Sequence, residues 1–139
     1  MKAARVLPGA DGGRIEVHDI PISEPGPGEV LIRVRASGLN LGEIKYMREH
    51  RIGSPMTAGV EFAGEVVAVG KQVEGWREGD RVMGHGRGCD AQYVVAAPLA
   101  LMPVPDGVSW IDAAAFPNVF ITAHDALVSN GELKAGETV

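Results

Sequence analysis

The stretch Thr57–Gly70 reads TAGVEFAGEVVAVG and carries the strongest information about the fold. Its β-branched content over residues 61–69 favours a strand, although glycine weakens strands. Gly59, Gly64 and Gly70 therefore mark bends or close approaches between backbones. A small, strongly curved sheet needs such kinks in order to close on itself. The stretch thus predicts one strand of a closed or nearly closed β-sheet.

Other short strands are predicted on both sides of this stretch. From Val30 to Arg35 the apolar residues recur with period two, which places one face of a strand in the core. The remaining predicted strands are Lys2–Leu7, Arg14–Ile20, a strand from Arg81, and residues 91–97, which Pro98 stops. Nineteen glycines and nine prolines in 139 residues supply the turns. About six short strands at close spacing favour a mainly β protein, a barrel or a barrel-like sandwich.

Helices are predicted at three places. Residues 39–48 form a loop that leads into a short helix. Ser109 is a helix N-cap, because an acidic residue follows it three places later and an alanine run comes next. Pro117 ends that helix, and Asn118 caps another that Asn130-Gly131 stops. After a turn in LKAGETV, a strand begins as the chain ends.

Size and charge narrow the classes of function. The chain is as long as one ordinary domain, and its net charge of −5 argues against nucleic acid or an anionic membrane as a partner. The first residues do not have the pattern of a signal peptide, and the longest apolar run, residues 93–104, is too short to span a bilayer. Cys89 is the single cysteine, so no internal disulfide forms, and a reducing cytoplasm is the simplest location.

Pattern alone identifies no catalytic residue. The four histidines have no metal-ligand spacing from one another or from Cys89. Ser37, Ser109 and Cys89 are potential nucleophiles, but none lies in a G-x-S-x-G elbow. The segment GHGRGCD at residues 84–90 lacks the spacing of a phosphate-binding loop and is interpreted as a turn.

Longer motifs resemble the medium-chain dehydrogenase/reductase superfamily. The segment GVEFAGEVVAVGKQV followed by WREGDRV is similar to that family's glycine-rich signature. The segments PGPGEVLIRVRASGLN, GCDAQYVV and DAAAFPNVFITAHDALV resemble three further family motifs, and all occur in family order. The resemblance implies the family's N-terminal catalytic domain, a GroES-like distorted β-barrel with short helices, two of them near the C-terminus. It covers nearly the whole chain.

The resemblance also implies a domain boundary. Residues 1–128 are expected to form the GroES-like domain, and residues 129–139 to lead into a Rossmann nucleotide-binding domain that is absent from this chain. In the family that domain makes most cofactor contacts. The 139-residue piece by itself is therefore expected neither to bind NADPH tightly nor to turn over, and the complete protein is expected to be a homodimer.

At two positions the chain resembles the zinc-free, zeta-crystallin-like quinone oxidoreductase branch of that family. Zinc-dependent alcohol dehydrogenases carry a cysteine where this chain has Asn40 and a histidine where it has Val60, and an aliphatic side chain cannot ligate a metal. The resemblance then implies zinc-independent hydride transfer from NADPH to a quinone or α,β-unsaturated carbonyl compound. The alternatives are an enoyl-thioester reductase, a scaffold module without redox activity, or a divergent subunit that has lost activity.

Three residues are candidates for the cofactor or substrate site by this resemblance: Asn40, Thr122 and Tyr46. Each has a structural alternative. Asn40 could cap the helix that starts near Leu41, Thr122 could bond its own helix backbone, and Tyr46 could pack on its helix. Glu61 belongs to the family signature, yet it could serve only as a hydrogen-bond acceptor. No tyrosine stands where mitochondrial-type enoyl reductases keep their proton donor, so the donor is not identified.

Overall fold

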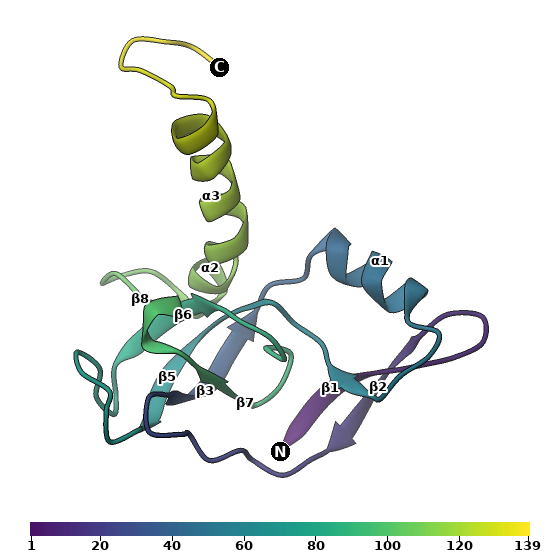
Figure 1. The fold of residues 1–139 in the computed structure, drawn as a ribbon. Coiled ribbons are helices and arrows are strands. Elements are labelled where there is room, and N and C mark those ends of the chain that lie inside the picture. The colour runs from purple at the N-terminus through teal and green to yellow at the C-terminus, as the bar shows by residue number, and fades with distance from the viewer.

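The computed structural model describes all residues 1–139 and confirms a mainly β fold (Figure 1). Its strands are antiparallel and form a three-stranded sheet in the order β2-β1-β4 and a five-stranded sheet in the order β7-β3-β5-β6-β8. A bridge between Ala3 and Ala91 links the two. The strands are β1 (Lys2–Leu7), β2 (Arg14–Asp19), β3 (Val30–Ser37), β4 (Met56–Thr57), β5 (Glu61–Val69), β6 (Arg81–His85), β7 (Tyr93–Ala96) and β8 (Leu101–Pro103).

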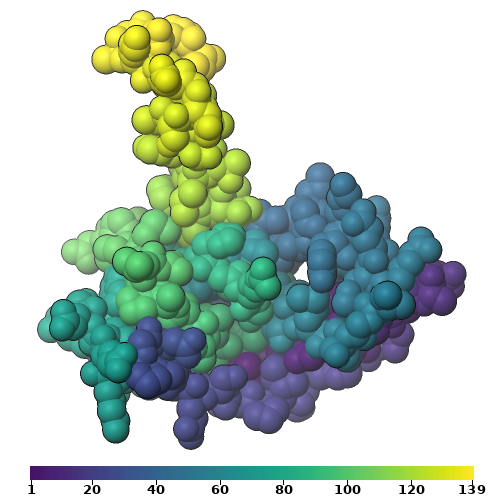
Figure 2. All heavy atoms as spheres, viewed as in Figure 1, coloured from purple at the N-terminus to yellow at the C-terminus, as the bar shows by residue number.

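The helices lie outside the sheets. They are α1 (Leu41–Glu49), α2 (Trp110–Ala114) and α3 (Pro117–His124), with a 3-10 turn η1 (Pro98–Ala100) and a π-helical segment η2 (Asp125–Asn130). Helix α3 and η2 form a column that stands away from the barrel (Figures 1 and 2). None of the helices combines the length and hydropathy needed to cross a lipid bilayer.

Glycines let the sheets curve as the sequence predicts. A Cβ atom on Gly64 would overlap the carbonyl oxygen of Arg33 on the neighbouring strand, and one on Gly70 would overlap that of Gly26. The register between β3 and β5 also shifts twice, which bends the pair. Close approach between backbones is thus the reason why the central strand accepts residues that weaken it.

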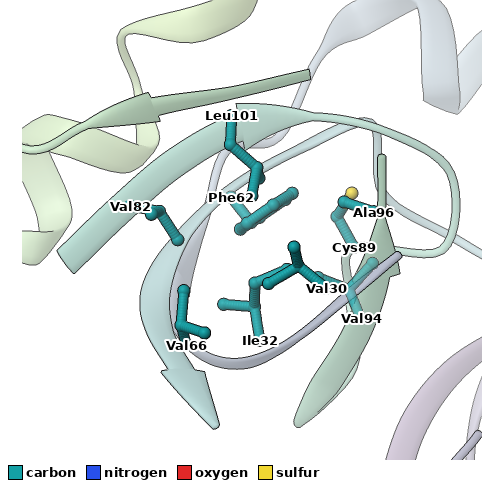
Figure 3. Close-up of a cluster of buried hydrophobic side chains, with 9 residues drawn as sticks. All are labelled: Val30, Ile32, Phe62, Val66, Val82, Cys89, Val94, Ala96 and Leu101. Atoms are coloured by element: carbon teal, nitrogen blue, oxygen red, sulfur yellow. The ribbon is translucent and has the colours of Figure 1, made fainter. Parts of the chain in front are cut away.

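A single aromatic ring fills the middle of the barrel. Phe62 is fully buried and packs with eight other buried residues from the five-stranded sheet and the loop before β7 (Figure 3). The cluster consists of Val30, Ile32, Phe62, Val66, Val82, Cys89, Val94, Ala96 and Leu101. A second, smaller cluster joins α2 to β5 and β6. This core holds the start of β5 at a defined place on the barrel rim.

Two local predictions near the C-terminus are wrong. The helix that Ser109 caps ends at Ala114, and Pro117 occupies the first turn of α3, where its missing N–H costs nothing. Asn118 therefore lies inside α3 and does not cap it. Residues 134–139 form no strand, because a strand needs a neighbour to pair its backbone groups and none is present there.

We expect Phe62→Ala to lower the free energy of unfolding by about 3–5 kcal/mol, because it leaves a cavity in the barrel. The matched control is Leu99→Ala, since the Leu99 side chain is fully exposed. That change should stay within about 0.5 kcal/mol. Urea denaturation measures both, and equal midpoints for the two variants would contradict the assigned core.

Cys89 should be unreactive in the folded protein. Burial raises the pKa of its thiol to about 12, and the carboxylates of Asp90, Glu43 and Glu61 add to the rise. At pH 8 only about one thiol in ten thousand is then ionised. We expect a thiol reagent to label Cys89 at that pH only after denaturation, as mass spectrometry would detect. Rapid labelling of the native chain would show that the site is open.

Candidate active-site cleft

Three chain segments meet at one edge of the barrel. The loop after β3 brings Gly38 and Asn40, β5 begins with Glu61, and α3 begins with Pro117 and Asn118. These segments are far apart in sequence, and the curvature of β3 and β5 brings them together. Their polar side chains form one connected network of hydrogen bonds.

The carboxylate of Glu61 lies at the centre of this network. Only 2% of the residue is exposed. Its Oε1 accepts a hydrogen bond from Asn40 Nδ2 at 2.9 Å, and its Oε2 accepts one from the backbone N–H of Asn118 at 2.8 Å. That N–H belongs to the first turn of α3, where no helical acceptor exists and the helix dipole favours a negative charge. Gly38 makes room for the carboxylate, because a Cβ atom there would overlap Oε1.

Asn40 uses most of its hydrogen-bonding capacity inside the protein. Its Nδ2 donates to Glu61 and, at 3.2 Å, to Glu43 Oε2, while its Oδ1 accepts from Asn118 Nδ2 at 2.7 Å. Asn40 is also the N-cap of α1, and its backbone N–H donates to Glu43 Oε2 at 2.8 Å. An amide has two N–H groups and two oxygen lone pairs, and these side-chain bonds use at least three of the four.

A cleft of about 760 Å³ opens beside this network. Its size is in the range of small-molecule sites in proteins. Apolar side chains come from α1, from the loop before it and from the segment before β5, and polar side chains come from the end of β6 and the loop after it. The lining includes Leu41, Ile44, Tyr46 and Val60 among the former and His85, Arg87 and Asp90 among the latter. Figure 2 shows a gap between α1 and the rest of the barrel.

Two carboxylates in the cleft wall keep an oxygen without a partner. Glu43 Oε1 and Asp90 Oδ1 are both buried and neither accepts a hydrogen bond from the protein. Burial raises the pKa of the Asp90 carboxyl, and the nearby charge of Glu43 raises it further. Buried acceptors without donors are costly, so these two oxygens lower the stability of the folded chain.

The structure brings two of the three predicted site residues together. Asn40 and Tyr46 both line the cleft, and the Tyr46 ring stacks on His50 with centroids 5.9 Å apart. Thr122 does not line it. Its Oγ1 donates to the Asn118 carbonyl at 2.6 Å, which is the backbone interaction considered as its structural alternative. Contact of any of these residues with a cofactor stays a prediction.

The sequence analysis missed three residues that shape the site: Glu43, Asp90 and Asn118. A signal for Glu43 was present, because it follows an N-cap asparagine by three residues, the spacing of a capping box. Asn118 was interpreted as a helix cap, so its hydrogen bond to the Asn40 side chain was not predicted. Nothing local indicated that Asp90, in a glycine-rich turn, would reach the cleft.

Comparison with known proteins identifies the family of the domain. The profile of the "Alcohol dehydrogenase GroES-like domain" matches residues 26–106, more than half of the chain. The chain belongs to the alcohol dehydrogenase GroES-like domain family. This domain occurs in the medium-chain dehydrogenase/reductase superfamily, as the motifs predicted.

Relatives of this GroES-like domain are much longer than the chain. It is 37% identical over 139 residues to "Spectinabilin polyketide synthase system protein NorB" from Streptomyces orinoci. This match covers 97% of the chain and 6% of NorB. It is 39% identical over 119 residues to "Synaptic vesicle membrane protein VAT-1 homolog" from Rattus norvegicus, which covers 83% of the chain and 30% of that protein.

Solved structures share the fold. The quinone oxidoreductase from Coxiella burnetii superposes with a TM-score of 0.89 at 29% identity over 99% of the chain. A mycobacterial protein complexed with NADPH superposes with a TM-score of 0.85 at 32% identity over 99% of the chain. The chain spans 47% and 44% of these two proteins, so it corresponds to about half of each.

We expect Glu61→Gln to destabilise this GroES-like domain by about 2–3 kcal/mol. The NH₂ group of the glutamine would face either the Asn40 amide or the Asn118 N–H, and two donors cannot bond each other. The control is Glu65→Gln on the same strand, where the carboxylate is 37% exposed and pairs with Arg35. That change should cost less than about 1 kcal/mol. Urea denaturation compares the two, and hydrogen exchange at the Asn118 amide should accelerate only in the first. Equal stability of both variants would contradict a central role for Glu61.

Proposed function

We propose that this chain supplies the catalytic domain of a zinc-independent oxidoreductase, which transfers hydride from NADPH to a quinone or an α,β-unsaturated carbonyl compound. The acceptor lies in the cleft beside Asn40 and Tyr46. Similarity to a quinone oxidoreductase and to a protein complexed with NADPH supports the proposal. The chain's own residues support it independently through the chemistry of the cleft wall.

The observation that carries the proposal is the pair Asn40 and Val60 in that wall. At these two positions the zinc-dependent alcohol dehydrogenases hold their metal with cysteine and histidine. The Val60 side chain has no lone pair, and the Asn40 side chain offers neither the thiolate nor the imidazole with which zinc is usually held. No three His, Cys, Asp or Glu side chains in the chain are grouped so that they could hold a metal ion. The donor set therefore does not fit zinc.

The lack of metal ligands sets the substrate class. Zinc stabilises the negative charge that develops on oxygen during hydride transfer to a carbonyl. Without it the acceptor has to spread that charge by conjugation, as quinones and α,β-unsaturated carbonyl compounds do and simple ketones do not. Leu41, Ile44 and Val60 give the cleft an apolar surface against which a flat, conjugated acceptor can pack.

The volume of the cleft is large enough for the nicotinamide end of the cofactor, which supports the proposal. Glu43 and Asp90 also line the cleft, and the carboxamide of nicotinamide carries N–H groups that a carboxylate can accept. When bound, NADPH supplies the hydride. Glu61 then acts through other residues, because it holds Asn40 in the wall and α3 at the rim.

An enoyl-thioester reductase is the second candidate. The 37% identity to a polyketide synthase protein favours it. Its acceptor is also an α,β-unsaturated carbonyl, so the same metal-free cleft would serve. The two functions differ in the group attached to the carbonyl carbon, a thioester in this case.

The decisive test is an assay of the complete natural protein that contains this domain. We expect NADPH oxidation with benzoquinone or cyclohexenone, none with cyclohexanone, and no loss of rate after treatment with a metal chelator. The absorbance of reduced nicotinamide measures all of these reactions. Turnover of a crotonyl thioester far faster than that of either acceptor would select the second candidate. Chelator-sensitive oxidation of ethanol with no quinone turnover would overturn both.

A further inference from the structure

A second cavity, of about 410 Å³, lies where the two sheets meet. Strands β1 and β4 and the segment after β2 form one side, and β7 with Leu31 of β3 forms the other. This cavity is separate from the cleft beside α1, although the two share part of a wall. It plays no part in the function proposed above.

The charged groups that line this cavity are cationic. Arg5 and Arg87 bring two guanidinium groups, and no aspartate or glutamate is among the lining residues. Neither arginine has a carboxylate within ion-pair distance anywhere in the chain. Glu16 stands opposite Arg5 in the strand register, but its oxygens pair with Arg14 and His18. Arg87 is exposed and Arg5 is half-buried, so both unpaired charges can act on a ligand in the cavity.

The guanidinium of Arg5 is held in place. Its Nη1 donates to Thr57 Oγ1 at 3.4 Å and its Nη2 donates to the carbonyl of Pro55. The residue is half-buried, so the group loses little freedom when it binds a ligand. Three of its five N–H donors remain, in the planar fork that matches the oxygens of a phosphate or carboxylate.

Other lining residues add hydroxyl groups and an apolar surface. Ser23, Thr57 and Tyr93 contribute hydroxyls, which can donate to an anion. Ile20, Leu31, Met56 and Val95 contribute aliphatic surface. A cavity with cationic, hydroxyl and aliphatic groups suits a ligand that has an anionic head and a small apolar body.

We propose that this cavity binds a small organic anion with a phosphate or carboxylate head. Arg5 and Arg87 contact the head, and the aliphatic side chains contact the body. The volume is near the lower end of the range for ligand sites, so the body is no larger than a single ring or a short chain.

The shared wall decides which residues can test the site selectively. Met56, Thr57, Arg87 and Gly88 line both the cavity and the cleft, so their substitution would disturb both. Arg5 and Tyr93 line the cavity alone. Because Arg5 also donates to Thr57 of the shared wall, substitution of Tyr93 is the more selective test of the cavity.

The test is a titration of the isotope-labelled chain with phenyl phosphate and with benzoate, followed by two-dimensional amide NMR. We expect at least one anion to cause saturable shifts at residues 5, 23, 57 and 93–95. Benzyl alcohol, which has a similar body and no charge, should cause none there. The relative affinities of the two anions then assign the head group. No saturable shift at millimolar concentration, or shifts confined to α1 and the cleft, would overturn the proposal.

Substituted chains provide a second test of the proposed site. Arg5→Gln should weaken binding at least about tenfold, because a charge-assisted bidentate contact is lost. Arg77→Gln removes the same charge from an 88% exposed side chain and should change affinity less than about twofold. Tyr93→Phe removes only a hydroxyl and should weaken binding severalfold, which gives a readout if Arg5→Gln does not fold. Unchanged affinity in Tyr93→Phe and in a folded Arg5→Gln would count against the site.

Discussion

The carboxylate of Glu61 holds together the parts of the molecule that form the cleft. Glu61 is the first residue of β5, and its carboxylate accepts one hydrogen bond from the Asn40 side chain and one from the backbone N–H of Asn118 in α3. Pro117 is the one buried residue of α3, and beside it Asn118 ties the first turn to Glu61 and Asn40 by hydrogen bonds. A buried charge is costly unless donors surround it, and the two N–H groups meet that need.

This arrangement also explains the chemical character of the cleft. Because Glu61, Glu43 and Asn118 take up most of the donors and acceptors of Asn40, the wall at this position presents few free polar groups. The neighbouring Val60 adds an aliphatic surface. Such a wall suits hydride chemistry on a conjugated, largely apolar acceptor, where orientation and exclusion of water matter more than acid catalysis.

Much of the barrel could be predicted from local sequence. The β-branched residues of 61–69 and the alternation from Val30 correspond to β5 and β3, because side-chain period and backbone geometry are coupled within each strand. The two-residue β4 and three-residue β8 were missed, since strands this short carry no period and form only because a partner lies beside them. Ser109 was identified as a cap because its partner, Asp112, is local.

The amino-acid sequence by itself determined three features: the mainly β class, the bends at glycines and the aliphatic side chain of Val60 in place of a metal ligand. Each of them follows from a residue type and the pattern of residues next to it. Tertiary structure alone decided which polar groups meet. Asn118 and Asn40 lie 78 positions apart and bond at 2.7 Å. Asp90 and Glu43 reach one cleft from different segments. Such contacts depend on how curved strands place distant segments side by side, and no local period encodes that placement.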